Sequence, residues 1–139
     1  MMEVKIKKLN SEAVTPTYGS EGAAAFDLYA LEDTGVFMPT LIPTGISMEV
    51  PKGYVLLVVP RSSIGLKTTL RMPHSTGVID SDYRGEIKVM YESMEPMVVK
   101  KGERIAQGMI IPVAKVDFEE VKELSSTDRG NGGFGSTGV

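Results

Sequence analysis

Residues 53–60 read Gly-Tyr-Val-Leu-Leu-Val-Val-Pro, a continuous apolar run bounded by a glycine and a proline. The run has the length of a strand and is far too short to cross a membrane, so it predicts a strand that is covered on both faces. Residues 109–113, Met-Ile-Ile-Pro-Val, form a similar run in which Pro112 marks a strand edge or a bend. Both runs therefore predict buried strands.

Shorter segments with alternating side chains lie around these runs. Apolar residues alternate with lysines in residues 4–7, and residues 86–91 carry Ile87, Val89 and Tyr91 at every second position. This two-residue period is typical of half-buried strands. Helical spacing is almost absent, and only residues 62–67 predict one short helical turn. With 15 glycines and 8 prolines between the apolar stretches, the sequence predicts an all-β sandwich or barrel.

Length and composition limit the classes of function. A chain of 139 residues predicts one domain with a modest core. It contains no cysteine, which excludes disulfides and thiolate metal sites, and its net charge of −3 argues against duplex nucleic acid as the main partner. Residues 1–10 contain no signal-peptide core, and no apolar run reaches membrane-spanning length. We therefore expect a cytoplasmic protein with neither a nucleic-acid nor a membrane partner.

The last fifteen residues differ from the rest of the chain. Residues 125–139 contain five glycines and only two apolar side chains, Phe134 and Val139. Such a segment cannot bury enough surface to order itself, so it is either a frayed terminus or a flap that orders on a ligand. Residues 130–135 match G-x-G-x-x-G, but no helix can follow them, so we reject a dinucleotide site. We expect a barrel domain at residues 1–124 and a flexible arm at residues 125–139.

Two short polar stretches are candidate sites that remain ambiguous when taken alone. Asp80 and Asp82 lie two residues apart in Gly-Val-Ile-Asp-Ser-Asp-Tyr-Arg-Gly, and such residues more often form a tight turn than a catalytic pair. Residues 61–63, Arg-Ser-Ser, suit an anion-binding turn but equally a solvated loop. The single histidine, His74, fits a loop residue better than a base or a metal ligand.

Considered together, five segments carry a specific resemblance. Residues 24–28, 60–63, 77–87, 102–107 and 129–138 resemble, in order and spacing, the five motifs of the homotrimeric dUTPase family. The resemblance implies a jelly-roll-like β barrel of the β-clip type with a Gly-rich C-terminal arm. It also implies a homotrimer with shared active sites that hydrolyses dUTP to dUMP and pyrophosphate with Mg²⁺. This reaction limits uracil incorporation into DNA and supplies dUMP for dTMP synthesis.

The resemblance assigns roles around the phosphates. Phosphoryl transfer needs a directed water together with positive charge and donors at the phosphate oxygens. Asp80 is implied to be the general base that activates this water. Asp27 is implied to hold Mg²⁺ through water, which suits an ion that retains its hydration. The implied phosphate contacts are Arg61, Ser62 and Gln107 in the barrel and Arg129 and Ser136 in the arm. Ser63, Lys88 and Gly135 are further implied substrate-binding residues.

The resemblance also assigns the contacts with base and sugar. Residues 75–79 resemble the hairpin that holds uracil through backbone groups, and cytosine would leave such groups unpaired. Tyr83 is implied to pack on deoxyribose, and Phe134 to stack over uracil when the arm closes. His74 stands where many members carry asparagine, and Gly108 where many carry a bulkier apolar residue. The implied residues on this side are His74, Gly77, Val78, Ile79, Tyr83 and Phe134.

Two alternatives remain at this point. A dCTP deaminase shares the fold and binds a similar nucleotide, but the stretch from Asp80 to Gly85 and the complete Gly-rich tail are closer to the dUTPase pattern. A non-catalytic nucleotide-binding or regulatory protein could also use this fold. The joint presence of Asp80, Arg129 and Phe134 argues against that second alternative.

Overall fold

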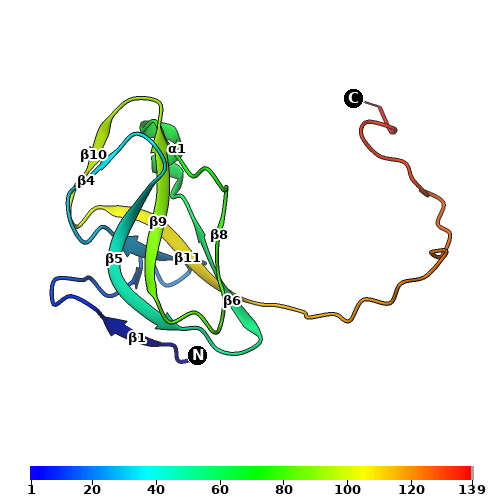
Figure 1. Cartoon of the computed structure of the whole chain (residues 1–139), viewed down its shortest axis with the longest axis horizontal. Helices are drawn as coiled ribbons and strands as arrows, with labels where there is room; N and C mark the ends of the chain where they lie inside the picture. Colours follow the sequence, from blue (N-terminus) through cyan, green and yellow to red (C-terminus); the bar gives the residue numbers. More distant parts are fainter. Residues whose placement is uncertain (139) are drawn as a thin grey trace.

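The computed structural model describes residues 1–138, which form an antiparallel β barrel with one short helix (Figure 1). The expectation of an all-β fold is confirmed. The elements in chain order are β1 (Lys5–Lys8), β2 (Thr17–Tyr18), β3 (Phe26–Tyr29), β4 (Thr34–Val36), β5 (Thr40–Glu49), β6 (Tyr54–Val59), α1 (Ser62–Lys67), β7 (Leu70–Arg71), β8 (Gly77–Ile79), β9 (Glu86–Ser93), β10 (Met97–Val99) and β11 (Arg104–Pro112).

Two sheets face each other across the core. One has the strand order β1-β5-β9-β7, and the other has the order β2-β3-β11-β6-β8. A small third sheet pairs β4 with β10. Each sheet contributes apolar side chains to one core, and its fully buried members include Leu28, Ile42, Leu56, Ile87, Val89, Tyr91 and Ile105.

A buried tyrosine links the two main sheets. The register of β11 against β3 shifts between Arg104 and Ala106, so Ile105 lies at an irregular point of the ladder. The hydroxyl of Tyr91 on β9 donates a 2.6 Å hydrogen bond to the carbonyl oxygen of Ile105. Burial raises the pKa of this phenol well above its ordinary value. The bond therefore satisfies two buried polar groups and fixes β9 against β11.

A β-bulge in β5 fixes the start of β9. Pro43 lies opposite Lys88, but the next pair is Ser47 with Glu86, so β5 contains extra residues between these points. Gly45 lies in this bulge with φ of 71°, and a Cβ there would lie 2.9 Å from the Cβ of Ala13. The Gly45 N–H donates to Glu86 Oε2 at 3.0 Å, and Ser47 Oγ donates to the carbonyl oxygen of Gly85 at 3.0 Å.

The strands agree with the sequence pattern at most points and disagree at two. The sequence predicts a buried strand at residues 109–113, but residues 111–113 are exposed, because β11 runs out of the barrel at its end. The other disagreement lies at the N-terminus. The run at residues 54–59 forms β6 with no exposed residue, and residues 62–67 form α1. The expectation of a half-buried first strand is wrong, because all residues of β1 are exposed. β1 lies at the edge of its sheet, where the alternation of apolar and charged residues does not ensure that another element covers the apolar face. Within residues 1–138, no helix has the length and apolar character needed to cross a membrane.

The C-terminal segment leaves the barrel. β11 ends at Pro112, and residues 113–138 form neither helix nor strand and run away from the sheets (Figure 1). Phe118, Leu124 and Phe134 are almost fully exposed along this path. The boundary between residues 124 and 125 stays a prediction, and Val139 of the expected arm lies outside the described residues.

Replacing Tyr91 with phenylalanine tests the bond between the sheets. Tyr91→Phe should lower the free energy of unfolding at neutral pH by about 1–3 kcal/mol, because the Ile105 carbonyl loses its buried donor. The difference from wild type should shrink above about pH 10, where the tyrosine ionises only in the unfolded wild-type chain. Urea unfolding at fixed protein concentration measures both effects. Tyr54→Phe is the control, because its hydroxyl has no hydrogen-bond partner within residues 1–138, and an equal cost in both variants would contradict the prediction.

Candidate active site

Strand pairing assembles the first group of candidate residues. β11 lies between β3 and β6, and Gln107 of β11 is opposite Asp27 of β3 on one side and Val59 of β6 on the other. Gln107 Nε2 donates to the carbonyl oxygen of Pro60 at 3.2 Å, which ties β11 to the segment leading into α1. Three segments far apart in the sequence thus meet at one end of the five-stranded sheet.

The charge of Asp27 is shared between two arginines. This aspartate is only 8% exposed, and its Oδ1 lies 3.1 Å from Arg61 Nε, while its Oδ2 lies 3.7 Å from Arg104 Nη1. The carboxylate therefore orients two guanidinium groups that remain partly accessible, with net positive charge around it. Arg104 was not among the predicted site residues, although it stands in the quoted motif at residues 102–107.

The short helix α1 places the hydroxyls beside this group. Ser62 is exposed and Ser63 is half-buried, and Arg61 Nη1 donates to Ser63 Oγ at 3.5 Å. Ile64 is buried and fixes the helix on the core. Arg61, Ser62, Ser63, Gln107 and Asp27 therefore lie together as a cluster of anion-binding type, and the solvated-loop interpretation of residues 61–63 fits less well.

Gly108 lies beside this cluster, in a space that admits no larger side chain. A Cβ at Gly108 would come within 2.6 Å of the ring of Phe26 and within 3.0 Å of Leu56. The Phe26 ring, stacked edge-on against Tyr18 with centroids 5.8 Å apart, occupies the space that a larger residue would need. The small residue at position 108 is therefore a packing requirement.

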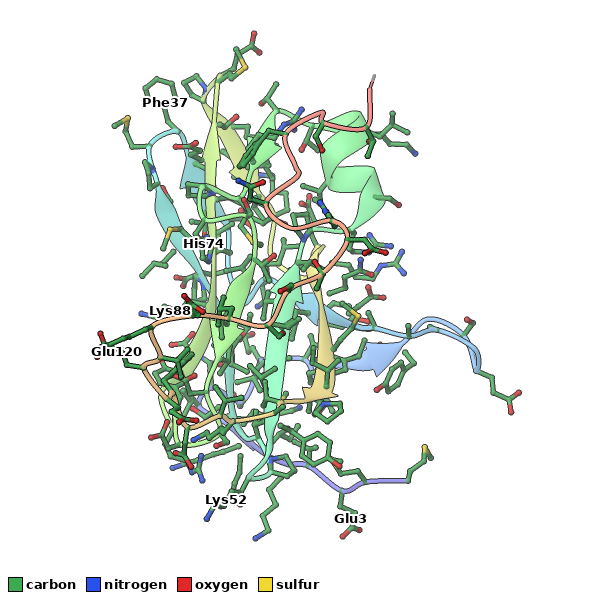
Figure 2. All side chains as sticks on the ribbon, turned by 90° about the vertical axis from the view of Figure 1, so that its right-hand side faces the viewer. Glu3, Phe37, Lys52, His74, Lys88 and Glu120 are labelled. Carbon is green, nitrogen blue, oxygen red and sulfur yellow. The ribbon has the colours of Figure 1, made fainter. Side chains whose placement is uncertain are left out.

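The second group of candidate residues surrounds β8, which pairs with β6. A cavity of about 140 Å³ lies here and is lined by His74, Gly77, Ile79 and Lys88, among others. Gly77 is buried, and a Cβ there would lie 3.2 Å from Val58 and 3.6 Å from His74 Nε2. Figure 2 shows His74 and Lys88 on the same side of the molecule. The backbone of Gly77 thus forms part of the cavity wall.

A neighbouring hollow of about 240 Å³ connects this cavity to Asp80. It shares Val78, Ile79 and Lys88 with the cavity and adds Asp80 and Tyr83. The Tyr83 hydroxyl donates to the carbonyl oxygen of Glu86 at 2.8 Å, and its ring covers Gly85 so closely that a Cβ would collide with it. Tyr83 is therefore held as a wall of this hollow.

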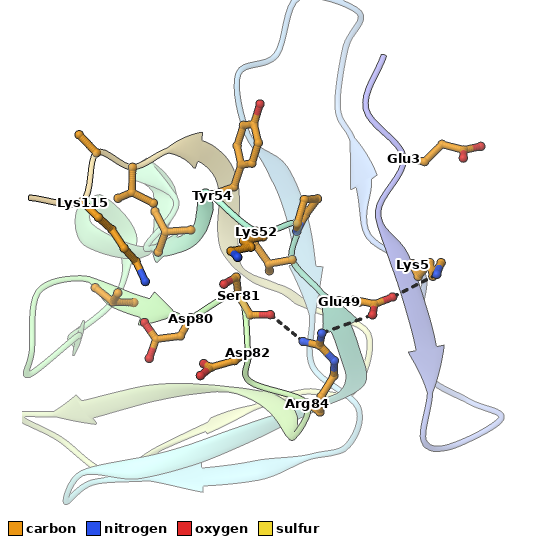
Figure 3. A pocket seen from close by; sticks show the side chains of 16 residues that line it. Glu3, Lys5, Glu49, Lys52, Tyr54, Asp80, Ser81, Asp82, Arg84 and Lys115 are labelled. Carbon is orange, nitrogen blue, oxygen red and sulfur yellow. Dashed lines mark hydrogen bonds and ion pairs between the residues drawn. The ribbon is translucent and has the colours of Figure 1, made fainter.

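Asp80 and Asp82 point into a wide groove on the other side of the same loop (Figure 3). The groove, of about 890 Å³, is lined by four acidic residues and by the basic Lys5, Lys52, Arg84 and Lys115. Among residues 1–138, neither aspartate has a hydrogen-bond or ion-pair partner for its carboxylate. Asp80 is exposed between the groove and the hollow, whereas Asp82 belongs to the turn that follows.

The predicted site residues do not line one common site within a single chain. Neither the cavity at β8 nor the neighbouring hollow is lined by Arg61, Ser62 or Gln107. The arm overlaps the barrel in Figure 2, but Figure 1 shows that it lies apart from it. Arg129 Nε donates within the arm to the carbonyl oxygen of Gly132 at 2.9 Å, and Phe134 is fully exposed. The candidate residues therefore form three separate groups in a single chain.

The donor set favours a metal ion held through a ligand and water over one bound directly by the protein. Within the described residues, no group of three or more His, Cys, Asp or Glu could hold a metal ion. Asp27 already compensates two guanidinium groups, which disfavours a directly bound divalent cation. A cation held mainly by the anionic groups of a ligand, with water between it and Asp27, fits this arrangement.

Comparisons with known proteins agree with the geometry. The sequence profile described as dUTPase matches residues 11–138. The chain is 46% identical to deoxyuridine 5'-triphosphate nucleotidohydrolase of Hydrogenobaculum sp. and 49% identical to that of Nautilia profundicola, in each case over 99% of both chains. Its structure is similar to that of a Staphylococcus bacteriophage 80alpha dUTPase with dUPNHPP, with a TM-score of 0.89, 27% identity and full coverage of both chains.

The packing of Tyr83 on Gly85 can be tested without a ligand. Gly85→Ala should lower the free energy of unfolding by about 1–3 kcal/mol, because the added methyl group displaces the Tyr83 ring. In a Tyr83→Ala background the same substitution should cost much less, since the obstacle is gone. Gly35→Ala, where nothing lies within 4 Å, is the matched control for urea unfolding. Equal costs with and without the Tyr83 ring would refute this packing role.

Proposed function

The chain belongs to the dUTPase family, and we propose that it hydrolyses dUTP to dUMP and pyrophosphate in active sites that neighbouring copies of the chain complete. The observation that carries this proposal is Asp80, an exposed carboxylate that has no side-chain partner within residues 1–138 and lines a hollow adjoining the cavity at β8. The same chain holds an anion-binding cluster around Asp27 and Arg61.

The chemistry needs a base, and Asp80 suits this role. A water that attacks the α-phosphorus must lose a proton, and a carboxylate within reach can accept it. Because no side chain within residues 1–138 engages Asp80, its oxygens are free to bind that water. Asp82, which belongs to the turn, has no role in this step.

The cluster around Arg61 suits the phosphate groups. Arg61 and Arg104 supply positive charge, and Asp27 holds both guanidinium groups in place. Ser62, Ser63 and Gln107 add donors that can bind phosphate oxygens. Asp27 would hold Mg²⁺ through water, and the ion would supply positive charge that offsets part of the phosphate charge.

The β8 cavity suits a pyrimidine base joined to deoxyribose. The backbone of Gly77, Val78 and Ile79 offers donors and acceptors along one edge, and a base with the opposite pattern would leave them unpaired. Tyr83 narrows the adjacent hollow where the sugar would lie, which excludes a 2'-hydroxyl. His74 and Lys88 line the cavity and complete its surface.

Completion by other copies explains the separate groups in one chain. A closed cyclic homotrimer would place the β8 cavity of one subunit against the Arg61 cluster of a second. The arm, with Arg129, Phe134, Gly135 and Ser136, would then cover the site, with Phe134 on the base and Arg129 and Ser136 on the terminal phosphate. The separation of residues 113–138 from their own barrel and the exposure of Phe118 and Phe134 in this segment support binding to another copy.

We place this reaction in the cytoplasm, where the absence of cysteine fits a reducing environment. There it would limit uracil incorporation into DNA and supply dUMP for dTMP synthesis. The deaminase alternative has no support from these relatives, which are named nucleotidohydrolases and match this chain over nearly its full length.

The reaction and its base are tested with one substitution. The wild-type protein should release pyrophosphate from dUTP much faster than from dTTP, dCTP or UTP. Asp80→Asn should retain dUTP binding but lower kcat by about 10²–10⁴-fold, because the amide cannot accept the proton. Asp82→Asn is the matched control and should keep wild-type turnover. Ammonia release from dCTP would instead support a deaminase, and unchanged kcat in Asp80→Asn would remove this residue from its role.

The shared site is tested by mixing two inactive chains. One carries Asp80→Ala with an intact arm, and the other ends after Asp128 with Asp80 intact. Co-refolding should restore activity in up to roughly one quarter of the sites of a randomly mixed cyclic trimer. If mixed trimers are confirmed by mass and no activity returns, the arm acts on its own subunit. The hydrolase activity itself would be unaffected by that result.

A further inference from the structure

The loop between β8 and β9 is closed by an arginine that folds back on it. Arg84 Nη1 donates to the carbonyl oxygen of Ser81 at 2.7 Å and to that of Tyr83 at 3.1 Å. These carbonyls lie three and one residues before Arg84, so a single nitrogen closes the turn. Figure 3 shows the guanidinium group beside Ser81, between the loop and the barrel.

The other side of the same guanidinium group reaches the barrel. Arg84 Nη2 lies 3.3 Å from Glu49 Oε1, and Glu49 Oε2 lies 3.4 Å from Lys5 Nζ (Figure 3). Glu49 is the last residue of β5 and pairs with Lys5 of β1 in the strand register. Exposed ion pairs of this kind contribute little to stability by themselves. Their effect here is geometric, because one planar group binds the loop and the strand end together.

The closed loop carries two groups that the reaction needs at defined positions. Asp80 precedes the first bound carbonyl, and Tyr83 carries the second. Within residues 1–138 the Asp80 carboxylate has no partner, so the backbone of this loop sets its position. Tyr83 is also held through the carbonyl oxygen of Glu86, which links the loop to the first residue of β9.

We propose that Arg84 is a positioning residue that holds Asp80 and Tyr83 at fixed positions relative to each other, with Glu49 as its anchor on the barrel. The proposal rests on the proposed dUTP hydrolysis and names a residue that determines both its rate and its sugar specificity. A small displacement of a reacting group can lower the rate about 10²-fold. A loosened loop therefore affects proton transfer and the exclusion of a 2'-hydroxyl together.

The chain contains a matched control for this interaction. Arg71 Nη1 donates to the carbonyl oxygens of Thr68 and Leu70 at 3.0 Å and 2.7 Å, again three and one residues earlier. Arg71 is exposed like Arg84, but residues 68–71 carry none of the proposed site residues. Loss of the same local bonds can thus be compared at and away from the site.

Arg84→Lys and Arg71→Lys are compared in the full-length protein. Lysine keeps the charge, but its ammonium lacks the planar fork in which Nη1 reaches both carbonyls while Nη2 reaches Glu49. Arg84→Lys should lower kcat for dUTP about tenfold or more and should lower the ratio of kcat/KM for dUTP to that for UTP. Arg71→Lys should keep the wild-type kcat and ratio. Both variants should show a similar, small shift in the urea midpoint.

Glu49→Gln supplies a second, mild variant at the barrel end of the contact. It should lower kcat and the dUTP/UTP ratio in the same direction but less strongly, and its effect should vanish in the Arg84→Lys background. Additive effects of the two substitutions would contradict the anchor role of Glu49. Wild-type kcat and dUTP/UTP ratio in Arg84→Lys would overturn the whole proposal.

Amide hydrogen exchange separates this proposal from the proposed function. Exchange at residues 81–83 should be faster in Arg84→Lys than in wild type and unchanged in Arg71→Lys, whether or not the protein turns over dUTP. A wild-type protein that releases no pyrophosphate from dUTP would refute the hydrolysis. Unchanged exchange at residues 81–83 in Arg84→Lys would refute the positioning role.

Discussion

The antiparallel register of β11 between β3 and β6 is the constraint on which the rest of the site depends. Side chains along a strand alternate between two faces, so a slip of one residue would move Gln107 away from Asp27 and Pro60. The same β6 pairs on its other edge with β8, which carries the wall of the base cavity. One strand order thereby determines both the anion-binding cluster and the cavity, and it separates them by the width of the intervening strands.

The second main sheet holds the reactive loop through an irregularity of its own. The bulge in β5 presents the N–H of Gly45 and the hydroxyl of Ser47 to Glu86 and Gly85, at the point where the loop ends. In a regular β5 strand, the backbone near Gly45 and Ser47 would take part in the hydrogen bonding between strands. The irregular backbone thus provides hydrogen bonds next to the turn that carries Asp80 and Tyr83.

The sequence was informative where the physical signal was local. The unbroken apolar run at residues 54–59 predicted β6 with its observed bounds, and the polar turn after Pro60 predicted α1. Alternation failed at β1, because a period of two shows which residues share a face but not whether another element covers it. The motifs identified Asp27, Arg61 and Gln107, but the role of Arg104 depends on its distance from Asp27, which only the paired strands define. The closure of the loop by Arg84 likewise depends on backbone geometry that its sequence neighbours do not reveal.

Gly108 on β11 and Phe26 on β3 share one space between their strands, so the sizes of these two residues depend on each other. The ring from β3 fills the volume that a side chain on β11 would take, directly beside the residue that binds Pro60. A bulkier residue at this position would therefore have to be accompanied by a smaller or differently turned side chain on β3. In relatives, a larger side chain at the position of Gly108 should therefore occur together with a smaller one at the position of Phe26. Such paired changes would keep the spacing of the two strands constant. The width of the anion-binding cluster would then also stay constant.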